Sequence, residues 1–251
     1  MSIADKLQTI AENQQAVYEK GKQDEYDRFW DNYQQNGERR RYRYAFADLG
    51  WTVDTFKPKY KMTLSASGAV GIFYLCNSGT KGDTNPLDYR EFGHLLDFSQ
   101  AADGQSAFYG AKMNYINVDL SNCTRLQSCF SGDYNSNYLS DLTLKVSEKC
   151  TNYTNAFGYC AYLINLTFVE GSVIASDLAF NRSPKLTKAS LLSIFTALST
   201  TVSGKTVTVH KTAVNKAFET SEGANDGSTS QEWLDLIATR SNWTVSLSEL
   251  T

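Results

Sequence analysis

Apolar residues in the middle of the chain recur with one spacing: an apolar residue, two others, a second apolar residue, one other and a third apolar residue. The spacing occurs three times, at Met113, Ile116 and Val118, at Leu139, Leu142 and Leu144, and at Leu163, Leu166 and Phe168. The last two positions of each set alternate as in a β-strand with one buried face. A pattern that returns after roughly 20–30 residues predicts units that each contribute one short strand and stack on their neighbours.

A second marker, a small residue followed by phenylalanine, runs in step with the first. It occurs at Ala107-Phe108, Cys129-Phe130, Ala156-Phe157 and Ala179-Phe180. Because the two series interleave, we expect clear repeats over residues 113–186 with the phenylalanines in their core. Polar residues such as Asn117 and Thr143 alternate with the apolar strand positions. Each predicted strand therefore has a solvent face, which is the natural binding surface.

The first part of the chain predicts a helix over residues 2–35. Ile3, Leu7, Ile10 and Val17 follow a heptad spacing of alternating four-residue and three-residue steps, with Gln14 between the last two. About two heptads are too few to hold a helix alone in water. We therefore expect these four apolar residues either to mediate homo-oligomerisation or attachment, or to pack against the domain that follows.

The pattern changes near residue 60. Residues 1–60 join the predicted helix to an aromatic-rich junction that ends at Lys57-Pro58, and we assign them to an N-terminal helical arm for oligomerisation or attachment. Residues 61–251 form the second predicted domain, in which 187–251 follow the repeats as a cap. The fold class expected from this order is α+β, with parallel strands flanked by helices.

The predicted cap consists of two helix-strand pairs. Thr187 is a candidate N-cap for a helix with an apolar stripe, which a strand over residues 206–210 follows, with Val207 and Val209 inward. A capping box at Thr229-x-x-Glu232 opens the second helix, and a strand with Trp243 follows. We expect this cap to cover the open edge of the last repeat, because an uncovered strand edge recruits other chains.

Composition narrows the class of partner. The 251 residues are 41% hydrophobic and 20% charged, with a formal net charge of −3. Such a chain has no electrostatic attraction to nucleic acid, and we read the one basic run, Arg39–Tyr44, as an edge strand rather than a base-stacking site. No window approaches the roughly 18 apolar residues of a membrane helix, so we expect no membrane span. The first residues also lack the apolar stretch of a secretory signal.

Residues with catalytic or ligating chemistry form no recognisable motif. The two histidines, His94 and His210, are isolated, and no nucleophile-elbow or phosphate-loop pattern is present. The five cysteines include no C-x-x-C pair. We expect buried free thiols at the four that lie within the repeats, Cys123, Cys129, Cys150 and Cys160. The prediction is a protein that is not an enzyme and has no cofactor and no metal site.

Tyrosines concentrate around the repeats and are the candidate ligand-binding residues. They are Tyr134, Tyr138, Tyr153, Tyr159 and Tyr162. Rigid aromatic rings among Asn and Ser are typical of recognition surfaces for a protein or glycan. Because tyrosine is intermediate in burial, we expect about half of them to be exposed.

The segment Ala156-Phe157-Gly158-Tyr159-Cys160-Ala161-Tyr162-Leu163 resembles the BspA-like subclass of leucine-rich repeats, whose units pair a strand with Ala-Phe and a following Cys-x-x-Leu. The resemblance covers residues 90–186 and is partial, since Cys129 replaces the alanine of one unit and Ser183 the cysteine of another. It implies a short solenoid of parallel strands. Terminal segments, including 9–13, 17–21, 44–47, 56–60 and 186–194, resemble proteins of phages and prophages of gut Firmicutes, many of them tail-associated.

The two resemblances together imply a virion component. This would be a non-enzymatic phage structural or receptor-binding protein, synthesised in the host cytoplasm, that contacts a protein or glycan on a cell surface or other virion proteins. Two alternatives stay open. One is a bacterial surface or effector-type leucine-rich-repeat binding protein, and the other is an intracellular phage protein that inhibits a host factor by binding.

Overall fold

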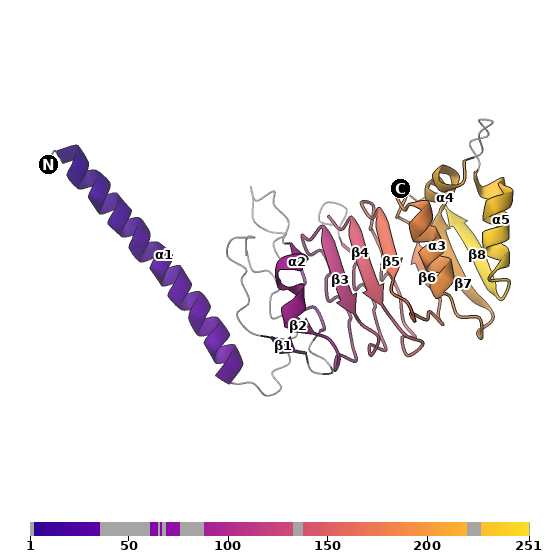
Figure 1. Ribbon diagram of the computed structural model, residues 1–251, viewed down its shortest axis with the longest axis horizontal. Helices are drawn as coiled ribbons and strands as arrows, with labels where there is room; N and C mark the ends of the chain where they lie inside the picture. The colour runs from indigo at the N-terminus through magenta and orange to yellow at the C-terminus, as the bar shows by residue number, and fades with distance from the viewer. Residues whose placement is uncertain are drawn as a thin grey trace. The chain divides into compact units, whose positions relative to one another are not determined.

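The computed structural model describes residues 3–35, 61–64, 66, 69–75, 88–132, 138–219 and 227–250. The chain divides into two compact units, Met1–Arg40 with Pro58–Tyr60, and Arg41–Lys57 with Lys61–Thr251. Figure 1 shows the helix of the first unit and the strands and short helices of the second. The predicted boundary near residue 60, the basic run at Arg39–Tyr44 and Tyr134 lie outside the described residues.

The described residues of the N-terminal unit form the helix α1, over Ile3–Gln35. No proline interrupts it, and Asp5 places a negative charge in the first turn, where the helix dipole favours it. The Thr9 hydroxyl donates to the Asp5 carbonyl, and Gln8 donates to Glu12 one turn further on. The helix predicted from the heptad spacing is confirmed.

The C-terminal unit is mixed α/β with short parallel sheets. Its largest repeated feature is a sheet of β3, β4 and β5, which span Tyr115–Asp119, Asp141–Lys145 and Asn165–Phe168 (Figure 1). Pairing places Ile116 opposite Leu142 and Leu142 opposite Leu166, so equivalent positions of the recurring spacing form rows across the sheet. All nine apolar residues of that spacing are buried. The predicted core face is therefore confirmed.

A column of phenylalanines runs through the same unit beside these strands. Successive ring centroids are 5.4 Å apart for Phe73–Phe108, 5.6 Å for Phe108–Phe130, 5.5 Å for Phe130–Phe157 and 4.6 Å for Phe157–Phe180. Backbone hydrogen bonds join the same segments, as from the Phe108 N–H to the Cys129 carbonyl at 2.9 Å. The phenylalanine marker thus places one aromatic ring in each layer of the core.

The turns that carry these phenylalanines share one backbone conformation. The residue two positions before the ring has a left-handed φ of 53° to 58° at Gly71, Ser106, Ser128 and Asn155. Only the first is glycine, the residue for which this conformation is least costly. Its recurrence in four segments indicates that the turn itself repeats, together with the apolar spacing.

The entry to the C-terminal unit is made of very short elements. The strands β1 (Met62–Thr63) and β2 (Leu96–Asp97) form a parallel pair. Two short helical turns, α2 (Tyr89–Phe92) and η1 (Gly93–Leu95), come directly before β2 in the chain. The Asp88 carboxylate caps α2 by accepting from the Arg90 N–H at 3.0 Å. Residues 69–75 form turns rather than a strand.

The C-terminal part contains a second parallel sheet and three helices. The sheet runs β6-β7-β8, and the strands span Leu178–Phe180, Lys205–His210 and Trp243–Ser248. The helices are α3 (Lys188–Ala197), α4 (Lys211–Ala217) and α5 (Gln231–Ala238), with a 3-10 turn, η2 (Gly227–Thr229), before α5. Thr187 caps α3 as predicted, and Val207 and Val209 are buried.

Two features of this part differ from the predictions. The capping box at Thr229 is wrong by one residue, because Thr229 lies in η2 and the Ser230 hydroxyl accepts from the Trp233 N–H. Glu232 instead lies 2.5 Å from the Lys188 ammonium. Helix α4 was not predicted, since its cap is the ring nitrogen of His210, which accepts from the Thr212 N–H at 3.1 Å.

Helix α3 covers the outer edge of β5 through serine hydroxyls. The Leu166 N–H donates to Ser190 Oγ at 2.9 Å, and Ser190 Oγ donates to the Ile164 carbonyl at 3.0 Å. The Phe168 N–H donates to Ser193 Oγ at 2.8 Å. These hydroxyls occupy the hydrogen-bonding positions that a further strand would fill, so the β3–β5 sheet ends at β5. The expectation that the C-terminal part covers this edge is confirmed.

Candidate functional site

The predicted tyrosines separate into exposed and buried residues. Tyr138, Tyr159 and Tyr162 expose 42%, 39% and 52% of their surface, whereas Tyr153 exposes 3%. Tyr153 lies in the core, and its burial raises the pKa of its hydroxyl well above the usual range. Its assignment as a ligand-binding candidate is corrected here, because a residue in the core presents no surface to a partner. Tyr134 is outside the described residues.

Each exposed tyrosine carries a cationic side chain over its ring. The Arg182 guanidinium lies 3.9 Å from the ring centroid of Tyr159, and the Lys185 ammonium lies 4.3 Å from that of Tyr162. The Lys112 ammonium lies 5.2 Å from the ring of Tyr138. Such contacts contribute about 0.5–1 kcal/mol each at exposed sites and hold both side chains in place. They define what we call the tyrosine–cation surface.

The cations are partners that sequence reasoning missed, although the repeats contain a signal for them. Tyr159 and Arg182 each follow a stacked phenylalanine by two residues, and Tyr162 and Lys185 each precede a buried leucine. Aligned on these markers, tyrosine and cation occupy equivalent positions in neighbouring repeats. The alignment alone would have placed them side by side.

The solvent face of β3–β5 is polar, and its side chains bond between strands. Asn165 donates through Nδ2 to the Asp141 carboxylate at 2.7 Å, and the Lys145 ammonium lies 3.9 Å from the Asp119 carboxylate. Thr143 and Thr167 lie opposite each other in the register of β4 and β5. Amide, hydroxyl and carboxylate groups in rows can bind a polar ligand, and their mutual bonds order them in advance of binding.

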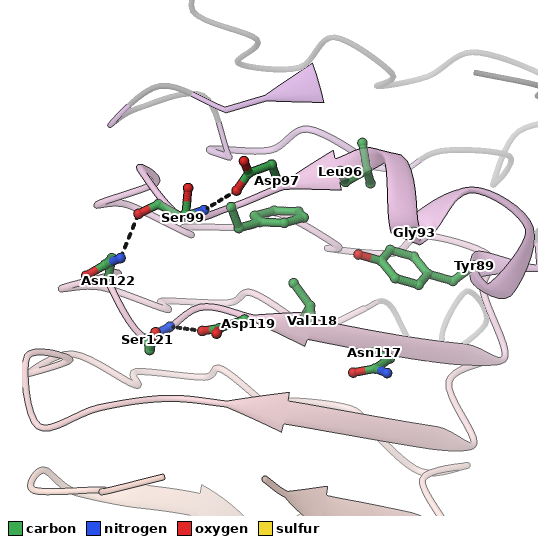
Figure 2. A pocket seen from close by; sticks show the side chains of 11 residues that line it. Tyr89, Gly93, Leu96, Asp97, Ser99, Asn117, Val118, Asp119, Ser121 and Asn122 are labelled. Atoms are coloured by element: carbon green, nitrogen blue, oxygen red, sulfur yellow. Dashed lines mark hydrogen bonds between the residues drawn. The ribbon is translucent and has the colours of Figure 1, made fainter. Parts of the chain in front are cut away.

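A shallow pocket of about 220 Å³ lies between β2 and β3 (Figure 2). Figure 2 shows Tyr89 and Gly93 at one end of it, and Asp97 and Ser99 across from Asp119 and Ser121 at the other. The volume is below the roughly 300–1,000 Å³ of typical small-molecule sites. A Cβ on Gly93 would lie 2.1 Å from the Tyr89 ring, so this glycine permits the ring to line the pocket.

The polar groups of this pocket are engaged within the fold. The Asp97 carboxylate accepts from the Ser99 N–H, and the Asp119 carboxylate accepts from the Ser121 N–H, at 2.9 Å each (Figure 2). The Ser99 hydroxyl and N–H lower the pKa of Asp97, with a further contribution from Lys61. Asn122 donates to the Ser99 carbonyl. A turn of the same kind thus follows β2 and β3, and the pocket results from the space between the ends of these two strands.

The four described cysteines are buried free thiols, as predicted. Burial raises the pKa of the Cys123 thiol to about 12, and it raises the pKa of Cys129 and Cys150 above their usual value. Cys123 and Cys160 donate to backbone carbonyls of the preceding layer, Ala101 and Phe130. Because burial raises the pKa of Cys123, Cys129 and Cys150, these three thiols are poor nucleophiles and act in packing.

The heptad residues of α1 are exposed on the isolated chain. Ile3, Leu7, Ile10 and Val17 expose between 52% and 80% of their surface. Four large apolar side chains in one stripe have no covering group among the described residues of the helix. Whether they mediate homo-oligomerisation stays a prediction.

Comparison of the chain with family models, curated proteins and solved structures gives no match. Among the helices that the structure describes, none combines the length and apolar character needed to cross a membrane. No three His, Cys, Asp or Glu side chains cluster as metal ligands within the described ranges.

Proposed function

We propose that this chain is a non-enzymatic phage structural or receptor-binding protein. Its repeats form a BspA-like leucine-rich-repeat solenoid, and their surface contacts a protein or glycan on the host cell. The N-terminal helix mediates homo-oligomerisation or attaches the protein to other virion proteins.

The observation that carries the proposal is the in-register stacking of equivalent residues across β3, β4 and β5. Stacked repeats bury one face and expose the other, so they provide a long, preorganised surface instead of an enclosed catalytic cavity. The exposed tyrosines with their cations supply the aromatic anchors that binding surfaces use. The uncovered apolar stripe of α1 supports a role in assembly.

The proposal is tested on purified particles of the phage that encodes the chain. Mass spectrometry of gradient-purified virions should detect peptides from both units of the chain in a constant ratio to the capsid protein. Particles from which the chain is consistently missing would refute a virion role. Detection only in the infected cell would favour the intracellular inhibitor, and detection on phage-free cells would favour the bacterial surface protein.

Host attachment has a separate test. Full-length protein added in excess to host cells should slow phage adsorption, because it occupies the receptor. Heat-unfolded protein at the same concentration is the control. Adsorption that is equally fast with native and unfolded protein would contradict the receptor-binding role while leaving a structural role open.

A further inference from the structure

We propose that Tyr159, Tyr162, Arg182 and Lys185 form a binding site for an anionic glycan, a polymer of sugars that carry carboxylate or phosphate groups. The inference rests on the proposed function, in which the repeat surface meets a cell-surface ligand, and it names the chemistry of that ligand. The four residues belong to the tyrosine–cation surface.

Two tyrosine–cation pairs lie in adjacent positions of the same two repeats. Arg182 is over Tyr159 at 3.9 Å and Lys185 is over Tyr162 at 4.3 Å, measured to the ring centroids. A guanidinium held against a ring keeps its N–H donors available at its edge, where they fit a carboxylate or phosphate with two hydrogen bonds. The ring contact removes side-chain freedom before the ligand arrives, which lowers the entropic cost of binding.

The charge of these cations is not neutralised by a neighbouring carboxylate. Among the ion pairs formed by described residues, none includes Arg182 or Lys185, whereas Lys61, Arg90, Arg125, Lys145, Lys188 and Lys211 all pair with Asp or Glu. Arg182 and Lys185 lie three residues apart in the sequence and both keep a positive charge without an ion pair among the described residues. They attract an anion to this part of the surface.

The backbone at Tyr159 has the conformation that recurs at this position of the turn. Its φ is +59°, and Leu75 and Gly110, which lie two residues after Phe73 and Phe108, have φ values of 52° and 59°. Glycine is the residue for which this conformation is least costly, so the fold accepts glycine at the position of Tyr159. The tyrosine side chain, which exposes 39% of its surface, is therefore not required by the turn.

The arrangement favours a polymer over a single small ligand. A further pair, Lys112 with Tyr138, occupies the position before the buried leucine or methionine in earlier repeats, as Tyr162 and Lys185 do in later ones. Sugar rings present apolar faces to aromatic side chains and hydroxyls to polar groups, and acidic sugars add a regularly spaced charge. At this position the repeats carry Lys112, Tyr138, Tyr162 and Lys185 in order, so two rings are flanked by two cations along the chain, which matches that chemistry.

The test uses the full chain and measures binding to four probes: polygalacturonate, phosphorylated dextran, neutral dextran and oligothymidylate. The variants are Arg182→Gln with Lys185→Gln, and Tyr159→Gly. The charge-matched control is Lys149→Gln with Lys216→Gln, in the loop after β4 and in α4. Melting temperatures of all variants verify folding. Tyr159→Gly removes the ring at a left-handed position that glycine adopts without strain, and its melting temperature separates a loss of binding from a loss of folding.

We expect the wild-type chain to bind polygalacturonate or phosphorylated dextran, with the stronger of the two identifying the anionic group, and not neutral dextran. The Arg182/Lys185 variant should bind at least about tenfold more weakly, since charge-assisted hydrogen bonds are lost. Tyr159→Gly should bind more weakly at an unchanged or higher melting temperature. The control should stay within about twofold of wild type, because distant exposed charges are screened.

Several results would overturn the inference. They are failure to bind either acidic polymer, equal affinity for neutral dextran, unchanged binding in the Arg182/Lys185 variant, and tighter binding of oligothymidylate than of either acidic glycan. A chain that gives one of these results yet still slows phage adsorption retains the proposed function and loses only the anionic-glycan site.

Discussion

Phe157 is the fourth of the five rings in the phenylalanine column, and its environment gives the first prediction. It is fully buried between Phe130 and Phe180. Replacing it with alanine leaves a cavity that the neighbouring rings cannot fill. We expect Phe157→Ala to lower the free energy of unfolding by about 3–5 kcal/mol, measured by chemical denaturation.

The matched control is Tyr162→Ala, which removes an aromatic ring of similar size from the surface of the next turn. We expect it to cost less than about 1 kcal/mol, the value of an exposed cation–π contact. Equal losses in the two variants would mean that the column is not the main packing element of this part of the core.

The buried thiols give a prediction about alkaline pH. In the unfolded chain Cys123 loses its proton near pH 9, its ordinary pKa, whereas in the folded chain burial raises that pKa to about 12. The unfolded state therefore gains a stabilising ionisation that the folded state cannot match. The free energy of unfolding should fall as pH rises from about 9 toward 12, by up to about 1.4 kcal/mol per pH unit for each such thiol.

A Cys123→Ala variant separates this effect from general alkaline unfolding. Its free energy of unfolding should fall less steeply above pH 9 than that of the wild-type chain, whatever its stability at pH 7. Cys129, Cys150 and Tyr153 keep contributing in the same direction, since burial raises the pKa of each. Identical slopes in the two proteins would show that Cys123 ionises equally easily in both states.

At this scale the sequence predicted buried residues better than exposed ones. The recurring spacing identified nine core positions correctly because strand alternation determines them. Tyr153 and Tyr159 could not be separated in the same way. Both lie outside the strands, where no simple period relates position to burial, and the left-handed backbone at Tyr159 follows from the turn rather than from the residue.

Among the elements, the contact between α3 and β5 depends on hydroxyl groups. Ser190 Oγ accepts from one β5 backbone N–H and donates to a backbone carbonyl. We expect Ser190→Ala to lower the free energy of unfolding by about 1–3 kcal/mol, because buried backbone groups lose their partner. Thermal and chemical denaturation measure the change.

Ser176→Ala is the control for this substitution. The Ser176 hydroxyl also donates to a backbone carbonyl, that of Thr151, but at an exposed position where water can replace it. We expect a change within about 0.5 kcal/mol. A Ser190 variant as stable as this control would indicate that water satisfies the edge of β5.

Strands and helices with strong periodicity were predictable, and elements defined by local hydrogen bonding were not. The heptad spacing gave α1, and the alternating valines gave β7. The cap of α5 was misassigned because Thr229 and Ser230 are both good cap residues and only the 3-10 turn distinguishes them. The marker at Phe180 lies in strand β6, whereas the same marker at Phe108, Phe130 and Phe157 lies in turns.

For the whole molecule, the assembly role of α1 is the feature to test. Deleting residues 1–35 should lower the mass measured by light scattering to that of a monomer while circular dichroism shows a folded C-terminal unit. The physical reason is that the exposed heptad stripe would lose its partner helices. Equal oligomeric states with and without the helix would contradict the assembly role.

Two single substitutions refine that test. Leu7→Lys places a charge in the apolar stripe, and Gln8→Lys adds the same charge one position away, outside the stripe, beside Glu12, with which Gln8 already bonds. Only the first should dissociate the assembly. Dissociation by both would indicate a general electrostatic effect instead of packing along the stripe.

For the whole molecule, the order of α1, the three central strands and α3, β7, α5 and β8 was predictable, but helix α4 and the split into two sheets were not. The repeats suggested one continuous stack, whereas the C-terminal part forms its own sheet, β6-β7-β8. The change occurs because α3 occupies the edge of β5, and nothing in the apolar period identifies a helix whose serines imitate a strand. To predict the cations of the candidate site, the repeats must be aligned on both the apolar spacing and the phenylalanine marker. The composition of a single repeat does not identify them.

The hydroxyl edge on α3 also determines where the chain can gain or lose a repeat during evolution. A strand added beyond β5 would compete with Ser190 and Ser193 for the same backbone N–H groups. A duplicated segment inserted between β4 and β5, 24 residues in length as from Asp141 to Asn165, would meet the same neighbours on both sides. We therefore expect a duplication inside the stack to be tolerated and one beyond β5 to be blocked, so that the exposed face can lengthen while both ends of the stack stay the same.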